Sequence, residues 1–481
     1  MLPVFDPQDS SCKTPFGAVP CGTTVTFTLR DETYYACELL VRREFSGMDE
    51  AAPLPPAEGG FSGVYTAPAE PELCWYGFRF TRDDGSTVCL GKNGWCGQDA
   101  LTRWQLTVYE DTPTPAWFGE GVTYQIFPDR FRRISVPETE GMVGHRWVHP
   151  CWDDQPVFLP EENGQITNRD FFGGSLAGIT EKLDYLQSLS VSTIYLNPIF
   201  EAGSNHRYNT ADYLAIDPML GTEEDFRTLC REAHDRGIRI ILDGVFNHTG
   251  SNSRYFNADG FYPEPGAAQS KDSPYFPWYS FHPWPTEYDA WWGIHTLPAV
   301  NEDAPDYRRF IISDEDSVVR RWLRCGADGW RLDVADELPD DFIAAIRTAI
   351  TQEKPDGYLL GEVWEDGSNK IAYSRRRRYL LGQETHGLMN YPFRTALLAW
   401  LGGGDAADFR RGMETIRENY PPAAFYGAMN FLGTHDTARI LTLLGAEDIP
   451  ADKPERAAYR LSPAELARGP VSYTHLTLPT K

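Results

Sequence analysis

The sequence lacks the features of a disulfide-stapled, zinc-binding or membrane-spanning protein. Its nine cysteines are an odd number and contain no Cys-x-x-Cys pair, so they predict reduced, mostly buried thiols. No apolar run approaches the length that crosses a membrane. The first residues also lack a basic start followed by an apolar stretch, so neither a signal peptide nor a transmembrane segment is seen. We therefore expect a cytoplasmic protein.

Basic residues are scarce as well. Forty-four Lys and Arg face 69 Asp and Glu, which gives a net charge of -25. Such a surface repels phosphate backbones and anionic lipids, so we expect neither nucleic acid nor membrane as a partner. The one basic run, Arg375 to Arg378, is interpreted as a solvated helix face. A neutral substrate fits this chain better, and its 14 Trp include the flat rings on which sugars stack.

A length of 481 residues predicts two or three domains. Short alternating stretches such as TVTFTL and WQLTVYE, separated by Pro and Gly, are typical of a small β-sandwich. We assign residues 1–112 to this domain, of a carbohydrate-binding type. Two prolines within residues 111–115 then indicate a linker.

Beyond the linker, amphipathic helices alternate with short apolar strands, which predicts parallel βα units. In the clearest unit, the hydroxyl of Thr222 caps a helix, with Asp225 in the capping-box position, and Gly237 ends it. One helix face carries Phe226, Leu229, Cys230 and Ala233. Two further helices carry Leu176, Ile179, Leu183 and Leu186, and Val318, Val319, Trp322 and Leu323.

Seven strands of a (β/α)8 TIM barrel are predicted within residues 113–469. They span residues 122–127, 192–197, 238–245, 328–334, 358–363, 387–391 and 429–433. The gap after the third strand is too long for one helix and is rich in aromatic residues, so residues 249–312 are interpreted as an inserted subdomain. We expect some of its rings to form a core and a few, such as Trp291 or Trp292, to face the substrate.

The end of the chain departs from this pattern, because the last βα unit is missing. Residues 470–481 have no periodicity and resemble a translated sequencing-library adapter, so we expect a non-native tail; an unusual native tail is the alternative. A barrel without its last unit keeps open edges. We therefore expect this chain to fold poorly or to be inactive, and the longer gene product to be active.

Polar residues recur where the predicted strands end, which is the face on which barrel enzymes place their active sites. They are Asp243, Asn247 and His248, then Arg331 and Asp333, then Glu362, and last His435 and Asp436. A single acid at a strand end is more often a cap or an ion-pair partner. The whole spaced set is harder to explain by capping, and it predicts an active site.

Four segments of this set resemble the four sequence regions of glycoside hydrolase family 13, the α-amylase family. They are DGVFNH (243–248), GWRLDVADE (329–337), GEVW (361–364) and FLGTHD (431–436). NPIFEAGSNHRYNTADY (197–213) and WWGIHTLPAVNE (291–302) resemble the neopullulanase, cyclomaltodextrinase and maltogenic amylase branch, which also carries an N-terminal β-sandwich. Together the segments are specific, whereas any one of them is weak.

The resemblance implies a role for each matching residue. Asp333 would be the nucleophile, Glu362 the general acid/base and Asp436 the third carboxylate. Arg331, His248, His435, Tyr208, Asp243 and Asn247 would bind or support the sugar, with Tyr208 stacked beneath it. No cofactor is required by this chemistry. Family members often bind Ca²⁺ and often dimerise through the N-terminal domain, but no liganding run of acidic residues stands out here.

Retaining hydrolysis needs two carboxyl groups about 5–5.5 Å apart, one ionised and one protonated. Arg331 lies two residues before Asp333, so both side chains share one face of a strand, and the guanidinium is expected to keep Asp333 ionised. We therefore expect hydrolysis of α-1,4 bonds in maltodextrins, cyclodextrins or pullulan. The alternatives are a glucanotransferase that uses the same residues and a catalytically silent glucan-binding protein.

Overall fold

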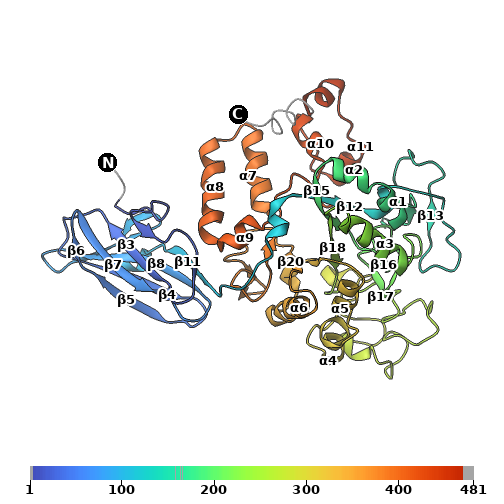
Figure 1. The fold of residues 1–481 in the computed structure, drawn as a ribbon, viewed down its shortest axis with the longest axis horizontal. Coiled ribbons are helices and arrows are strands. Elements are labelled where there is room, and N and C mark those ends of the chain that lie inside the picture. Colours follow the sequence, from blue (N-terminus) through green and yellow to red (C-terminus); the bar gives the residue numbers. More distant parts are fainter. Residues whose placement is uncertain (1–3, 158, 163, 165, 470–481) are drawn as a thin grey trace. The chain divides into compact units, whose positions relative to one another are not determined.

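The computed structural model describes residues 4–157, 159–162, 164 and 166–469. The predicted non-native tail, residues 470–481, lies outside the described residues. The chain forms two compact units, one of Met1–Thr114 with Trp364–Ala428 and the other of Pro115–Val363 with Met429–Lys481. The helices and strands of each unit carry the labels of Figure 1.

The N-terminal part of the first unit is a β-sandwich, as predicted. One sheet has the order β1 (Lys13–Thr14), β3 (Thr24–Leu29), β7 (Gly60–Thr66), β6 (Pro56–Ala57). The other has the order β10 (Gly94–Cys96), β9 (Thr87–Gly91), β8 (Glu72–Thr81), β11 (Trp104–Tyr109), β2 (Val19–Pro20), with β4 (Ala36–Arg43) beside β8 and β5 (Asp49–Leu54) beside β4. Alternate residues of β3 and β4 are buried, and both sheets contribute to one apolar core.

The remainder of the first unit holds the hairpin β21 (Ile371–Ala372) and β22 (Arg375–Arg376), β23 (Gly387–Leu388), and the helices α7 (Tyr391–Leu401), α8 (Ala406–Asn419) and α9 (Pro422–Tyr426). The predicted helix face at Arg375 to Arg378 is therefore wrong. Tyr373 and Ser374 have φ of 50° and 62°, which makes the tight two-residue loop of a hairpin. Their sequence lacks the Asn-Gly signal that usually marks such a loop.

The second unit is built on a parallel sheet whose strands are neighbours in chain order (Figure 1). They are β12 (Val122–Ile126), β15 (Val191–Leu196), β18 (Arg239–Gly244), β19 (Gly329–Leu332) and β20 (Tyr358–Gly361). These match the first five predicted strands. Chain-order neighbours in a parallel sheet are the arrangement of a βα barrel.

The seventh predicted strand, residues 429–433, is wrong. Met429 makes an isolated bridge and the following residues are irregular. The backbone N–H of Thr434 donates to Oγ1 of Thr437 at 2.8 Å, and the N–H of Asp436 donates to Oγ1 of Thr434 at 3.3 Å. These local hydrogen bonds turn the chain, because hydroxyl side chains compete with a strand ladder for backbone groups.

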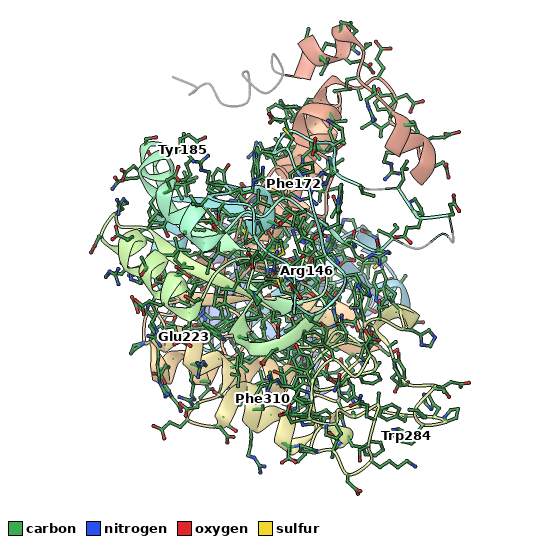
Figure 2. The ribbon with its side chains drawn as sticks, turned by 90° about the vertical axis from the view of Figure 1, so that its right-hand side faces the viewer. Arg146, Phe172, Tyr185, Glu223, Trp284 and Phe310 are labelled. Atoms are coloured by element: carbon green, nitrogen blue, oxygen red, sulfur yellow. The ribbon has the colours of Figure 1, made fainter. Side chains whose placement is uncertain are left out.

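The described part of the second unit contains eight helices, and the three helical segments that the pattern predicted are among them. The eight are α1 (Leu176–Glu181), α2 (Leu183–Ser188), α3 (Glu223–His234), α4 (Pro305–Arg308), α5 (Val318–Arg324), α6 (Asp340–Glu353), α10 (Ile440–Gly445) and α11 (Lys453–Ala458). The capping box of Thr222 and Asp225 is formed, and the predicted apolar face of α3 is buried. Figure 2 labels Tyr185 and Glu223 on the outer helices α2 and α3, and Arg146 in the interior, where its side chain is fully buried.

The aromatic segment after β18 has irregular backbone. Residues 249–304 form isolated bridges and two short 3₁₀ turns, Phe276–Trp278 and Trp291–Gly293. Its buried rings include Tyr255, Trp278 and Tyr279, with Tyr255 and Trp278 5.2 Å apart between ring centroids. The prediction that part of this segment forms an aromatic core is confirmed.

Four short strands complete the second unit: β13 (Trp147–Val148), β14 (Asp170–Phe171), β16 (Phe200–Ala202) and β17 (Thr210–Ile216). All nine cysteines are free thiols and six of them are buried, as expected. Among the described residues, no helix is both long and apolar enough to cross a membrane.

Candidate active site

One buried arginine joins three carboxyl groups from neighbouring strands. Nη1 of Arg331, in β19, lies 2.7 Å from Oδ1 of Asp243 and 2.6 Å from Oδ1 of Asp333. Its Nη2 lies 2.7 Å from Oε2 of Glu362. Asp243 belongs to β18, Asp333 follows β19 and Glu362 follows β20. The cluster therefore lies at the carboxyl ends of adjacent parallel strands, where the sequence predicted it.

The electrostatics of this cluster differ from the expectation. Burial raises the pKa of Asp243 and raises the pKa of Asp333 well above its usual range, although Arg331 lowers both. The charges of Glu362 and Asp243 raise the pKa of Asp333 further. Arg331 does lower the pKa of Asp333, as predicted, but burial and the neighbouring acids oppose this effect. A single guanidinium is divided among three carboxyl groups that have lost their water, so it offsets only part of the desolvation.

A strained residue fixes the position of Glu362. The backbone N–H of Val334 donates to Oε2 of Glu362 at 2.8 Å. Val334 has φ 38° and ψ 60°, a left-handed conformation that β-branched residues rarely adopt. Its neighbour Ala335 also donates its N–H to the carbonyl of Glu362, at 3.2 Å. Strain of this kind persists only where the surrounding structure holds it, and it is common at active sites.

Asp243 is held by two tyrosines as well as by Arg331. Its Oδ2 accepts from the hydroxyls of Tyr195 at 2.6 Å and Tyr208 at 2.7 Å. Nδ2 of Asn197 donates to the hydroxyl of Tyr208 at 2.8 Å. Tyr208 is thus anchored at its hydroxyl, and its ring lies parallel to the ring of His435, with 5.2 Å between centroids and 9° between planes.

The same network continues to the third predicted carboxylate. Nε2 of Gln125 donates to Oδ1 of Asn197 at 3.0 Å and to Nδ1 of His435 at 2.8 Å. Because Nδ1 of His435 accepts, its Nε2 carries the proton and donates to Oδ2 of Asp436 at 3.1 Å. Burial lowers the pKa of His435 to about 3. Hydrogen bonds therefore connect Asp436 to Tyr208 through the side chains of His435, Gln125 and Asn197.

Asp436 differs from the other acids in its exposure. Its side chain is 40% exposed, and among the described residues it pairs with His435 and not with Arg331. Burial raises its pKa to about 6, with a further contribution from the charge of Glu362. The structure thus brings eight of the nine predicted site residues into one buried region of the second unit and leaves Asp436 at its margin.

Two predicted residues, Asn247 and His248, have unused hydrogen-bonding groups. Nε2 of His248 lies 3.1 Å from the carbonyl oxygen of Tyr208, so Nε2 carries the proton and Nδ1 is an acceptor. Burial lowers the pKa of His248 to about 4. Neither Nδ1 of His248 nor the side-chain amide of Asn247 has a partner among the described residues, although both are buried. Buried polar groups are normally satisfied, so these atoms are available to water or to a polar ligand.

Sequence reasoning missed three residues of the network: Gln125, Tyr195 and Asn197. Asn197 directly follows β15, so the strand-end rule that selected Asp243 would have found it. Gln125 and Tyr195 lie inside strands, where the strand-end rule does not apply. Parallel strands are usually apolar on both faces, so a Gln within one is uncommon. This is the sequence signal by which Gln125 could have been found.

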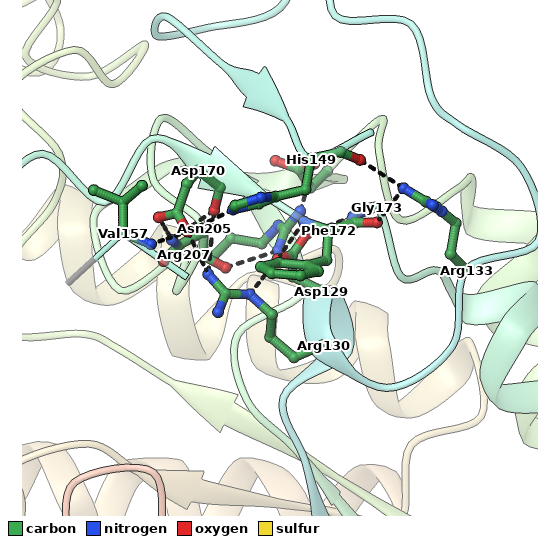
Figure 3. A network of polar contacts seen from close by, with 11 residues as sticks. Asp129, Arg130, Arg133, His149, Val157, Asp170, Phe172, Gly173, Asn205 and Arg207 are labelled. Carbon is green, nitrogen blue, oxygen red and sulfur yellow. Dashed lines mark hydrogen bonds and ion pairs between the residues drawn. The ribbon is translucent and has the colours of Figure 1, made fainter. Parts of the chain in front are cut away.

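The family that the chain resembles often binds Ca²⁺, which is held by several oxygen ligands, carboxylates among them. Among the described residues, no group of three or more His, Cys, Asp or Glu side chains could hold a metal ion. Figure 3 shows the acids nearest β13 and β14 already engaged: Asp129 pairs with Arg130 at 2.8 Å, and Asp170 pairs with Arg130 at 3.3 Å. Asp170 also lies 3.2 Å from Nε2 of His149. These residues do not fit a divalent cation.

Comparison with known proteins agrees with this geometry. The family profile described as "Alpha amylase, catalytic domain" matches residues 125–462. The chain belongs to the α-amylase family. The family prediction is thereby confirmed, and so is the barrel fold with an additional N-terminal domain.

Several curated proteins are similar to this member of the α-amylase family. Amylopullulanase of Thermoanaerobacterium saccharolyticum is 37% identical, over 96% of this chain and 40% of its own length. Cyclomaltodextrinase of Geobacillus thermopakistaniensis is 35% identical, over 69% of this chain and 52% of its own length. The chain spans between 27% and 60% of the length of the curated relatives that it matches.

Solved structures give the same result. The cyclic α-maltosyl-(1→6)-maltose hydrolase of Arthrobacter globiformis is 35% identical with a TM-score of 0.57, covering 69% of each chain. The type III pullulan hydrolase of Thermococcus kodakarensis is 28% identical with a TM-score of 0.61, covering 98% of this chain and 78% of its own.

Proposed function

We propose that this chain carries the catalytic site of a retaining glycosidase that hydrolyses α-1,4 bonds in maltodextrins, cyclodextrins or pullulan. The observation that carries the proposal is the pair Asp333 and Glu362, two carboxyl groups that contact one buried guanidinium within 2.7 Å from adjacent strands. Retaining glycosidases use such a closely spaced pair. The names of the relatives, which include an amylopullulanase and a cyclomaltodextrinase, support the substrate class.

In this proposal the reaction runs in two displacements. A carboxylate oxygen of Asp333 attacks the anomeric carbon, while the carboxyl of Glu362 gives its proton to the departing glycosidic oxygen. Glu362 then takes a proton from water, whose oxygen attacks the anomeric carbon and releases Asp333. His248, His435, Tyr208 and Asp436 surround the sugar that reacts. Nδ1 of His248, an acceptor without a partner among the described residues, suits a sugar hydroxyl.

The stereochemistry of the first product tests this reaction. We expect proton NMR, recorded within the first minutes of maltoheptaose cleavage, to show the α-anomer of the new reducing end, because two inversions retain configuration. The β-anomer as first product would contradict the proposal. The products are also analysed at high maltose concentration, as a control for transfer to sugar. A glucanotransferase would then accumulate longer oligosaccharides.

We also propose that the chemistry needs no metal ion, because no cluster of acids that could hold one is found among the described residues and Asp129 and Asp170 are paired with Arg130. Excess EDTA should leave both the melting temperature and the rate of maltodextrin hydrolysis unchanged, and added CaCl₂ should not raise either. A fall in melting temperature of several degrees with EDTA, reversed by Ca²⁺, would contradict this. A relative that binds Ca²⁺ serves as the positive control, since metal binding stabilises its folded state.

The remaining expectations stay predictions. They are the homodimer formed through the N-terminal domain, the cytoplasmic location, the domain boundaries at residues 112 and 469, and the poor folding or inactivity of this chain. If this chain is inactive, the activity and melting measurements are made on the longer gene product. The mass of the chain in solution by light scattering would decide the first of these.

A further inference from the structure

Trp292, in the aromatic segment after β18, combines exposure with backbone strain. Its side chain is the most exposed of the described large apolar residues, at 76%. Its φ of 50° and ψ of 28° lie in the left-handed region, which costs free energy for a bulky residue. Packing explains neither feature, because an exposed ring gains little from burial. A strained and exposed indole indicates a role in binding and not in stabilising the fold.

The Trp292 ring is held in place despite its exposure. Its Nε1 donates to Oε1 of Glu337 at 3.3 Å. The ring of Trp291 lies nearly parallel to it, with 5.0 Å between centroids and 19° between planes. An indole fixed at its polar edge and backed by a second ring presents one flat face to solvent.

The pair of tryptophans adjoins the proposed cleavage site. Trp291 stacks on His248, with 5.2 Å between centroids and 25° between planes. His248 in turn donates to the carbonyl oxygen of Tyr208 at 3.1 Å. Nε1 of Trp291 is buried and has no hydrogen-bond partner among the described residues. A row of flat rings therefore leads outward from the site.

We propose that Trp291 and Trp292 form a stacking platform for the arm of an α-glucan that extends beyond the sugar at the cleavage site. The C–H faces of glucose rings are apolar and pack on indole. The ligand is uncharged, which suits a surface of strongly negative net charge. This inference rests on the proposed function and adds a binding site for longer chains.

The test compares long and short glucans. Asp333→Asn is used as background so that the glucan stays intact, and binding of maltoheptaose and maltose is measured by calorimetry with and without Trp292→Ala. We expect the alanine variant to bind maltoheptaose about 10-fold more weakly and maltose within about 2-fold, since only the long glucan reaches the platform. Trp292→Phe, which keeps a ring, should recover part of the affinity.

Tyr185→Ala is the matched control, because Tyr185 is a 52% exposed ring on the outer helix α2. It should change neither affinity. Equal weakening for both glucans, or no weakening with Trp292→Ala, would overturn the platform. If the unaltered chain hydrolyses no α-glucan but maltoheptaose still binds through Trp292, the proposed function fails and the platform stands.

Discussion

Replacing Asp333 with asparagine is expected to lower hydrolysis of maltodextrins by on the order of 10⁴-fold, because the amide cannot form the covalent glycosyl intermediate at a useful rate. The rate is measured from reducing ends released from maltoheptaose. In the unaltered chain, Nη1 of Arg331 lies 2.6 Å from Oδ1 of Asp333. The amide has the size of the carboxyl and keeps an oxygen that can accept this hydrogen bond. Substrate affinity should therefore survive while turnover is lost.

The same variant tests the raised pKa of Asp333. A carboxyl whose pKa is raised by folding holds its proton more tightly in the folded state than in the unfolded chain. Stability is therefore lost as the pH rises above the ordinary aspartate pKa of 3.8. Asp333→Asn lacks this loss, so its melting temperature should exceed that of the parent near pH 8 and match it near pH 4.

The control for this prediction is Asp235→Asn, which removes an exposed carboxyl at the end of α3. It should change neither turnover nor the pH dependence of melting. Turnover by Asp333→Asn within about 10-fold of the parent would exclude Asp333 as the nucleophile.

Replacing Arg331 with methionine is expected to have the largest effect on stability. It leaves Asp243, Asp333 and Glu362 buried without their shared guanidinium, and breaking a buried ion pair costs about 3–5 kcal/mol. Chemical denaturation followed by tryptophan fluorescence measures this cost. Hydrolysis should be lost as well, because the guanidinium holds both carboxyls of the proposed reaction in place.

The cost of this variant should depend on pH with a definite sign. Without the guanidinium, the pKa of Asp243 and Asp333 rises further in the folded state, so the penalty is small near pH 4 and grows toward pH 8. Arg331→Lys is the control: it keeps a positive charge but reaches fewer carboxyls, and its penalty should be intermediate. Unchanged stability of Arg331→Met at pH 8 would contradict the assigned electrostatics.

The elements that were predicted correctly are those whose signals are local. Helix α3 follows from a hydroxyl and an acid three residues apart and from an apolar face of four residues, all within one short segment. The strands β12, β15, β18, β19 and β20 follow from short apolar runs between such helices. Strand-end polar residues were found by the same local rule.

The wrong predictions concern two segments whose structure depends on backbone dihedral angles or on side-chain hydroxyls. Neither can be read from the pattern of residue types. The hairpin at Arg375 requires positive φ at Tyr373 and Ser374, which ordinary residues rarely adopt. Residues 429–433 have an apolar start, but the hydroxyls of Thr434 and Thr437 turn the chain. In both places, a hydrogen bond or a dihedral angle decided the local structure against the pattern of residue types.

By itself, the sequence determined the family, the order of the βα units, and the acids and the arginine of the candidate site, because these depend on residue type and spacing. Only the tertiary structure decided that one guanidinium is divided among three carboxyls, so that burial raises the pKa of Asp333. It also decided that Gln125 and Asn197 link His435 to Tyr208. Desolvation and hydrogen bonding depend on which atoms the folded chain brings together, and residues far apart in the sequence carry no local signal of that contact.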